Sequence, residues 1–197
     1  MAMSTLWKLR VTGVAFLIGA AVVAVVFRSL TKDINADDTV ASAFDDARDE
    51  DENLRFESLE IKGVEPDGSV PPDGRVRVWF RDPAREVVKA TQKMPGAPKR
   101  GGDTCQGYEV RASYGGRRGR TRRDDSDWTH DSNCGPTTTR ALKCTVAQIW
   151  QRAIAKGAPN PAIAEVSAVV QPDGSIHWRL EIDERKYEFD DDCNAAL

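Results

Sequence analysis

Residues 162–182, AIAEVSAVVQPDGSIHWRLEI, contain two apolar-rich segments on either side of a Pro-Asp-Gly sequence. In the second segment, IHWRLEI, every other residue is apolar. This alternation is typical of a strand that buries one face, and an Asp-Gly dipeptide favours a tight turn. We therefore predict an antiparallel hairpin with strands at 162–171 and 175–182.

A helix is predicted before this hairpin and a third strand after it. In residues 144–156 the apolar positions recur at spacings of three, four and seven, and Gly157 follows as a stop signal. Either Cys144 or Thr145 would begin the helix. Beyond the hairpin, an Asp-Glu-Arg turn leads into a strand at 186–190. The order helix, strand, strand, strand predicts an α+β unit with an antiparallel sheet.

The chain contains a second copy of this pattern, 106 residues earlier. Residues 38–70 and 144–176 share nine identical residues over 33 aligned positions. The identities include a Thr-Val-Ala tripeptide in each predicted helix and a Pro-Asp-Gly-Ser tetrapeptide in each predicted turn. We infer an internal duplication.

The first copy is the longer of the two. A helix is expected at 38–49, and strands are expected near 54–65 and 75–82. A Pro- and Gly-containing loop at 85–102 then delays the third strand to 106–114. An arginine-rich turn follows, with a fourth strand near 127–129.

A long uncharged segment lies near the N-terminus. Val11–Phe27 contains 17 consecutive uncharged residues between Arg10 and Arg28. At ~1.5 Å per residue a helix of this length spans roughly 25 Å, which is close to what a bilayer requires. Lys8 and Arg10 precede the segment, so the positive-inside rule predicts a cytoplasmic N-terminus and a periplasmic body. We expect a retained anchor in inner-membrane lipid. The alternative is a cleaved signal peptide and a secreted body.

The predicted fold class is therefore α+β, with an N-terminal transmembrane helix and two duplicated α-β-β-β units, each with its helix on an antiparallel sheet. The predicted segments are a cytoplasmic tail at 1–10, a transmembrane anchor at 11–30, a linker at 31–37, a first unit at 38–134, a second linker at 135–143 and a second unit at 144–197.

All four cysteines follow the predicted anchor. An even number of cysteines in an exported domain favours structural disulfides, and four cysteines allow three connectivities. If the strands alternate in direction, the third strand of the second unit returns beside the start of its helix. We therefore expect Cys144 to pair with Cys193. Cys105 would then pair with Cys134 and close the arginine-rich hairpin.

The second copy resembles a known kind of module. A helix at 145–158 followed by AEVSAVV, PDGSIHWRLEI and KYEFD resembles the PepSY-like modules of exported bacterial proteins. This resemblance implies a protein that binds or restrains partners in the cell envelope. Such modules end on acidic-x-x-Thr-Gly, whereas this chain has Asp-Asp-Asp-Cys at 190–193, so no functional residue is carried over.

The charge distribution argues against nucleic acid as a partner. The formal net charge is −3. Residues 1–28 hold three of the basic side chains and no acidic one, so the remainder carries 25 basic and 31 acidic side chains. A net acidic body lacks the basic surface that phosphate backbones require.

Sequence motifs of catalysis are missing. The chain has no G-x-S-x-G, no H-E-x-x-H, no P-loop and no dinucleotide fingerprint, and it has two histidines, His130 and His177. We therefore expect a non-catalytic protein without metal or cofactor. Two alternatives stay open. One is a membrane-tethered hydrolase that uses scattered carboxylates, and the other is a ligand-sensing domain.

A cluster of arginines is the best candidate for a contact surface. Five of the seven residues at 117–123 are arginine. Outside the inner membrane such a cluster favours anionic lipid, a glycan or an acidic protein face. It is otherwise a solvated hairpin tip balanced by the aspartates that follow it. The candidate surface consists of Tyr114, Arg117, Arg118, Arg120, Arg122, Arg123 and Trp128. Together these features predict a membrane-anchored envelope protein whose periplasmic domain binds or scaffolds unidentified envelope proteins.

Overall fold

The computed structural model describes residues 34–83, 105–115, 121–131 and 135–194. The described residues belong to one compact unit. The predicted anchor, the predicted loop at 85–102 and the arginines at 117–120 lie outside them. Within these described ranges, no helix has the length and apolar character needed to cross a membrane.

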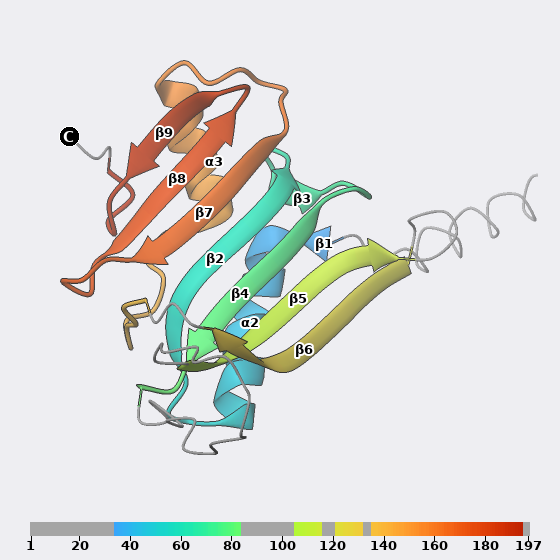
Figure 1. Ribbon diagram of the computed structural model, residues 1–197. Helices are drawn as coiled ribbons and strands as arrows, with labels where there is room; N and C mark the ends of the chain where they lie inside the picture. The colour runs from blue at the N-terminus through green and yellow to red at the C-terminus, as the bar shows by residue number, and fades with distance from the viewer. Residues whose placement is uncertain (1–33, 84–104, 116–120, 132–134, 195–197) are drawn as a thin grey trace, which may run out of the picture. The chain divides into compact units, whose positions relative to one another are not determined.

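A seven-stranded antiparallel sheet forms the centre of this unit (Figure 1). Its strand order is β6-β5-β4-β2-β7-β8-β9. These strands are β2 (Arg55–Val64), β4 (Arg75–Arg81), β5 (Cys105–Gly115), β6 (Thr121–Asp131), β7 (Ala164–Val170), β8 (Ile176–Ile182) and β9 (Arg185–Phe189). The short strands β1 (Ile34–Asn35) and β3 (Ser69–Val70) pair separately. The predicted α+β class with an antiparallel sheet is confirmed.

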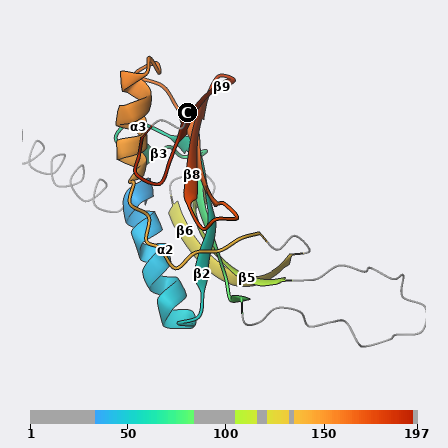
Figure 2. The same cartoon turned by 90° about the vertical axis from the view of Figure 1, so that its left-hand side faces the viewer.

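Two helices lie on the same face of the sheet (Figure 2). They are α2 (Ala36–Glu50) and α3 (Val146–Ala155). Thr145 caps α3 in a capping box with Gln148, in which each side chain accepts a hydrogen bond from the other residue's backbone N–H. Thr145, not Cys144, is therefore the N-cap of this helix, whose first residue is Val146.

The two helices bury equivalent positions. Both are amphipathic, and the buried residues of α3 lie 106 positions after buried or half-buried residues of α2. The equivalent pairs are Val40 and Val146, Ala43 and Ile149, Phe44 and Trp150, and Ala47 and Ala153. Each helix therefore packs its apolar stripe on the sheet in the same way.

The two Pro-Asp-Gly-Ser turns have the same geometry. The backbone of Gly68 has a φ of +83° and that of Gly174 a φ of +79°, a conformation that other residues adopt only with strain. In each turn the aspartate carboxylate, of Asp67 or Asp173, accepts hydrogen bonds from the serine two positions later. The distances are 2.9 Å to the backbone N and 2.6 Å to the hydroxyl in both turns.

The two predicted α-β-β-β units, named the first and second repeat from here on, share one sheet, whereas the sequence predicts a separate layer for each. The first long strand of each repeat lies at the junction, where β2 pairs antiparallel with β7. The pairing is symmetric under the 106-residue offset: Glu60 pairs with Ser167, the equivalent of Ile61, and Ile61 pairs with Val166, the equivalent of Glu60. Two separate sheets would each leave a long edge strand with unpaired N–H and C=O groups. Joining β2 to β7 satisfies both edges.

The predicted linker at 135–143 is part of the fold. The backbone N–H of Thr138 donates to the carbonyl of Phe56 at 2.9 Å, and the reverse bond is 3.1 Å long. Thr138 is buried. It extends the pairing of β2 beyond Ser58, where the pairing with β7 stops. The fourth strand, expected near 127–129, is also longer than predicted, because β6 pairs with β5 along its whole length.

Aromatic side chains fill the space between the helices and the sheet. The ring centroid of Phe44 on α2 lies 5.5 Å from that of Phe56 and 5.0 Å from that of Phe80. In the second repeat Trp150 of α3 and Trp178 of β8 are the largest fully buried side chains. Burial of rings this large contributes much of the driving force for folding.

Candidate functional site

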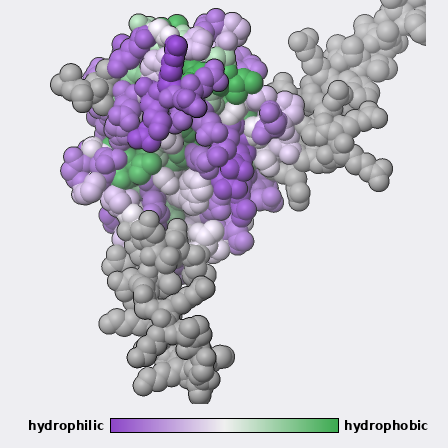
Figure 3. All heavy atoms as spheres, turned by 45° about the horizontal axis from the view of Figure 1, so that its top comes forward, coloured by the Kyte–Doolittle hydropathy of each residue, from purple (hydrophilic) through white to green (hydrophobic). Residues whose placement is uncertain are grey.

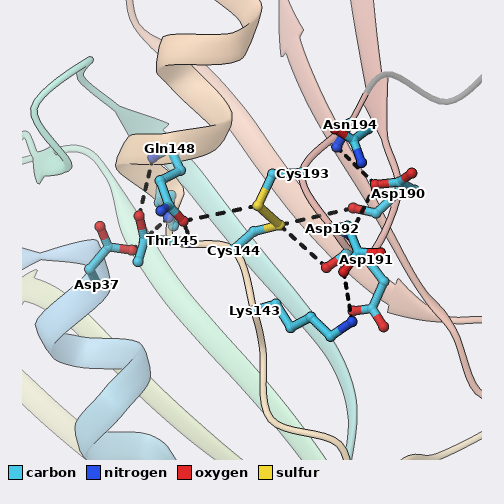
Figure 4. Close-up of a disulfide and its surroundings, with 11 residues drawn as sticks. Asp37, Lys143, Cys144, Thr145, Gln148, Asp190, Asp191, Asp192, Cys193 and Asn194 are labelled. Carbon is cyan, nitrogen blue, oxygen red and sulfur yellow. Dashed lines mark hydrogen bonds and ion pairs between the residues drawn. A yellow bond between two sulfur atoms is a disulfide. The ribbon is translucent and has the colours of Figure 1, made fainter.

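A disulfide joins the start of α3 to the end of the second repeat (Figure 4). Cys144 and Cys193 are bonded, with their Cα atoms 5.7 Å apart. This is the pairing that the strand directions predict. The expected pairing of Cys105 with Cys134 lies outside the described residues, because Cys134 is not described.

A tight turn after β9 presents Cys193 to the helix. The carboxylate of Asp190 accepts hydrogen bonds from the backbone N–H groups of Asp192 (2.9 Å) and Asn194 (2.8 Å). Beside it, the Lys143 ammonium donates to Asp192 at 2.7 Å, and this hydrogen bond raises the pKa of Lys143. Both groups are exposed, so the pair orients the turn more than it stabilises the fold.

Asp37 connects the two repeats at the helix termini (Figure 4). Its carboxylate belongs to the first turn of α2, yet it accepts the backbone N–H of Val146 at 2.6 Å and of Ala147 at 3.3 Å. These N–H groups begin α3 and have no acceptor within their own helix. The carboxylate also offsets the positive end of the helix dipole.

An apolar groove runs between α2 and the segment 138–146. One part of it is a hollow of about 260 Å³ beside the start of α3. Apolar side chains line most of it, among them Val40, Phe44, Leu142 and Trp178. Phe44 and Leu142 are only half-buried, so part of their apolar surface faces the groove.

The groove continues past the end of α2 with a more polar wall. A second hollow of about 250 Å³ shares Phe44, Arg48 and Ala141 with the first. Arg48 and Arg140 lie on its rim with Glu52. The side chain of Arg48 is 72% exposed and its ion pair with Asp45 measures 3.4 Å, so this guanidinium can exchange its partner at little cost.

Two residues of the predicted contact surface make structural contacts. The Tyr114 hydroxyl accepts the backbone N–H of Ile34 at 2.7 Å. The indole N–H of Trp128 donates to Glu50 at 3.0 Å, and its ring centroid lies 5.5 Å from that of Tyr108. Both therefore hold elements of the fold together.

No contact within the described residues brings the arginines of that surface together. Positions 122 and 123 belong to β6, where they pair with Tyr114 and Ser113 of β5. The described part of the structure does not include the side chains at 122 and 123 or the residues 117–120. The contact surface stays a prediction.

The sheet face opposite the helices carries charged side chains. Figure 3 shows a mostly hydrophilic surface with small hydrophobic patches. Ion pairs cross between neighbouring strands on this face. They are Arg179 with Glu188 at 3.1 Å, Lys186 with Glu181 at 3.7 Å, Lys62 with Glu165 at 3.9 Å and Arg77 with Glu109 at 3.6 Å.

Arginines gather on one part of this face. Arg75, Arg77 and Arg111 line a polar hollow of about 330 Å³ over β4 and β5. These residues are not among the predicted site residues, although the alternation Arg-Val-Arg-Val at 75–78 indicates two arginines on the face opposite the core.

Within the described ranges, no three His, Cys, Asp or Glu side chains lie close enough together to hold a metal ion. His177 lies on the open face as its alternation predicts, and its Nε2 is 3.8 Å from Glu188. His130 belongs to β6 and pairs with Gln106. The described residues therefore offer two surfaces that could contact a ligand or partner, namely the groove and the arginine hollow.

Comparisons with known proteins do not identify a relative. The chain matches no family model, and searches of curated proteins and of solved structures find no match.

Proposed function

We propose that this chain is a single-pass inner-membrane protein whose disulfide-linked periplasmic domain binds a partner protein of the cell envelope without catalysing a reaction. The uncharged segment Val11–Phe27 would be the anchor. The Cys144–Cys193 disulfide supports an oxidising compartment, because such bonds persist there and are rare in the cytosol.

An internal duplication is the second part of the proposal. Three features support it: equivalent buried positions in α2 and α3, identical bonding in the two Pro-Asp-Gly-Ser turns, and symmetric pairing of β2 with β7. The two α-β-β-β repeats would have fused edge to edge into one sheet. Such fusion leaves a groove at the junction, where the helix of one repeat meets the segment leading into the other.

The apolar groove is the observation that carries the binding function. It exposes part of Phe44 and Leu142, and Arg48 and Arg140 lie along its rim. The occupant that fits is a segment of a partner protein with a large apolar side chain and acidic residues beside it. An apolar side chain buried in a pocket supplies affinity, and the charges at the rim of the groove orient the bound segment.

Alkylation mapping of the protein in native membranes tests the compartment. We expect Cys144 and Cys193 to be protected before reduction and labelled after it. Protease added to spheroplasts should digest the body of the protein. Free thiols at both positions, or a body that resists external protease in intact spheroplasts but not in lysed ones, would contradict the proposed topology.

Steric blocking tests the groove. Ala141 is exposed and lines both hollows, so Ala141→Trp should fill the groove and abolish specific cross-linking to the partner. The matched control is Ala155→Trp, an exposed position on α3 that lines neither hollow. A partner that cross-links equally to both variants does not bind in the groove.

A further inference from the structure

We propose that Arg75, Arg77 and Arg111 form a binding site for a phosphate-type oxyanion on the open face of the sheet. The site does not depend on the groove or on the anchor. The hollow of about 330 Å³ is lined by these arginines, the turn at 72–74, Ser113 and Asp125. All of these residues belong to the described part of the chain.

Strand pairing concentrates the positive charge. Arg77 of β4 pairs directly with Arg111 of β5, and Arg75 lies two residues before Arg77 on the same face. Like charges directly opposite each other are unfavourable unless a counter-charge is present. Within the sheet that counter-charge is Glu109, whose carboxylate lies 3.6 Å from Arg77 and 3.5 Å from Arg111.

One carboxylate does not satisfy three guanidinium groups. The Glu109 side chain is only 10% exposed and is already shared by two arginines. Arg75 makes no ion pair with any described residue, and Asp125 is exposed and makes none either. Arg75 therefore has no ion-pair partner among the described residues, although the carboxylates of Asp73 and Asp125 also line the hollow.

One buried donor in this hollow also lacks an acceptor. The Nε–H group of Arg75 is shielded from solvent and makes no hydrogen bond within the described residues, whereas the Nε of Arg111 lies 3.5 Å from the Glu109 carboxylate. A buried donor without an acceptor is unfavourable, and such groups usually have a partner in the functional state. Arg75 and Arg111 belong to two different strands, so an anion that contacts both must offer several acceptor oxygens.

A tetrahedral oxyanion meets these requirements. Guanidinium groups bind phosphate through paired N–H donors, and a doubly charged anion offsets more than one arginine. The chemistry is the same whether the phosphate is free or belongs to a phospholipid headgroup. The two sources differ in the probe that binds.

The test follows the arginine Nε–H signals of the full-length protein in a non-ionic detergent by ¹H–¹⁵N NMR. Inorganic phosphate is titrated at constant ionic strength, and a short-chain phosphatidic acid is titrated in parallel. We expect a saturable shift of the Arg75 and Arg111 signals. Saturation by inorganic phosphate assigns free phosphate, and saturation by phosphatidic acid alone assigns a lipid headgroup.

Variants test whether binding depends on the residues of the hollow. Arg75→Gln should weaken binding at least tenfold, and Arg75→Lys should weaken it less because the charge remains. The control, Arg179→Gln, removes an arginine from the same face outside the hollow and should leave affinity within twofold. Asp125→Asn should strengthen binding severalfold, because it removes a negative charge from the hollow.

The proposal fails if neither probe shifts these signals, or if Arg75→Gln and Arg179→Gln bind alike. If Arg75→Gln does not fold, the wild-type titration and the Asp125→Asn variant still test the proposal. An affinity for the probe that is unchanged in Asp125→Asn would also overturn the site.

Discussion

The carboxylate of Asp37 accepts a hydrogen bond from the backbone N–H of Val146, 109 residues further along the chain. Asp37 lies in the first turn of α2, and Val146 is the first residue of α3. A side chain of one repeat therefore caps the helix of the other. This contact couples the stability of the two repeats across their junction.

Removal of this cap is expected to destabilise the whole domain. Asp37→Ala leaves the first N–H groups of α3 without an acceptor, and loss of a helix cap costs about 0.5–2 kcal/mol. Urea unfolding should show one transition at a lower midpoint. Asp46→Ala, an exposed position on the same helix, is the control and should leave the midpoint unchanged. Equal midpoints for the two variants would show that the contact contributes nothing.

The two Pro-Asp-Gly-Ser turns should make stability depend on pH. Hydrogen bonds from Ser69 and Ser175 lower the pKa of Asp67 and of Asp173 below the ordinary value. Because the folded-state pKa is the lower one, the stabilisation is fully present above the unfolded-state pKa of ~3.9. It is lost as the pH falls through the folded-state pKa.

Asparagine substitutions separate this effect from general acid unfolding. The Asp67→Asn/Asp173→Asn variant should be less stable than the wild type at pH 6, and the gap between their urea midpoints should narrow at pH 2.5. The control is Asp73→Asn. It changes an aspartate in the neighbouring turn whose carboxylate accepts no such hydrogen bond within the described residues. A gap that is the same at both pH values in the double variant would refute the assignment.

Loss of the Cys144–Cys193 disulfide should destabilise the second repeat strongly. The bond joins residues 49 positions apart. In the chain-entropy treatment, a disulfide that closes a loop of this length stabilises the folded state by about 4 kcal/mol. Urea unfolding of Cys144→Ala/Cys193→Ala against the wild type, both without reductant, measures the difference. A midpoint unchanged from that of the wild type would mean that the bond does not restrict the unfolded chain.

Tyr114 is expected to matter for folding whether or not it contacts a partner. Tyr114→Phe removes the acceptor for the N–H of Ile34, a fully buried residue, and an orphaned buried donor costs about 1–3 kcal/mol. Tyr187→Phe is the control, because the Tyr187 hydroxyl has no hydrogen bond within the described residues. Thermal unfolding of both variants gives the comparison. A Tyr114→Phe midpoint as high as that of Tyr187→Phe would contradict the structural role.

Most elements of the fold could be predicted from local sequence patterns. Apart from β6 and the two short strands, the predicted bounds lie within two residues of the observed ones. The strand β6 was underestimated because its sequence, TRRDDSDWTHD, lacks apolar alternation. Its extent is set by pairing with β5, which is a contact between strands and not a property of the segment.

The candidate sites were less accessible to sequence reasoning. The groove forms where α2 lies beside the segment 138–146, and nothing in either segment indicates the other. The arginine hollow combines Arg75 and Arg77 of β4 with Arg111 of β5, which only the register of the two strands brings together. By contrast, the partnership of Cys144 with Cys193 could be predicted, because it follows from strand direction within one repeat.

The sequence by itself determined the helices, the strands, the two identical turns and the disulfide of the second repeat. Each of these depends on periodicity or on residues a few positions apart, where local geometry limits the choices. Only the tertiary structure decided that β2 and β7 join the repeats into one sheet and that Asp37 caps the helix of the other repeat. The physical reason is that edge strands and helix ends must satisfy their backbone groups, and a sequence does not specify which distant partner will do so.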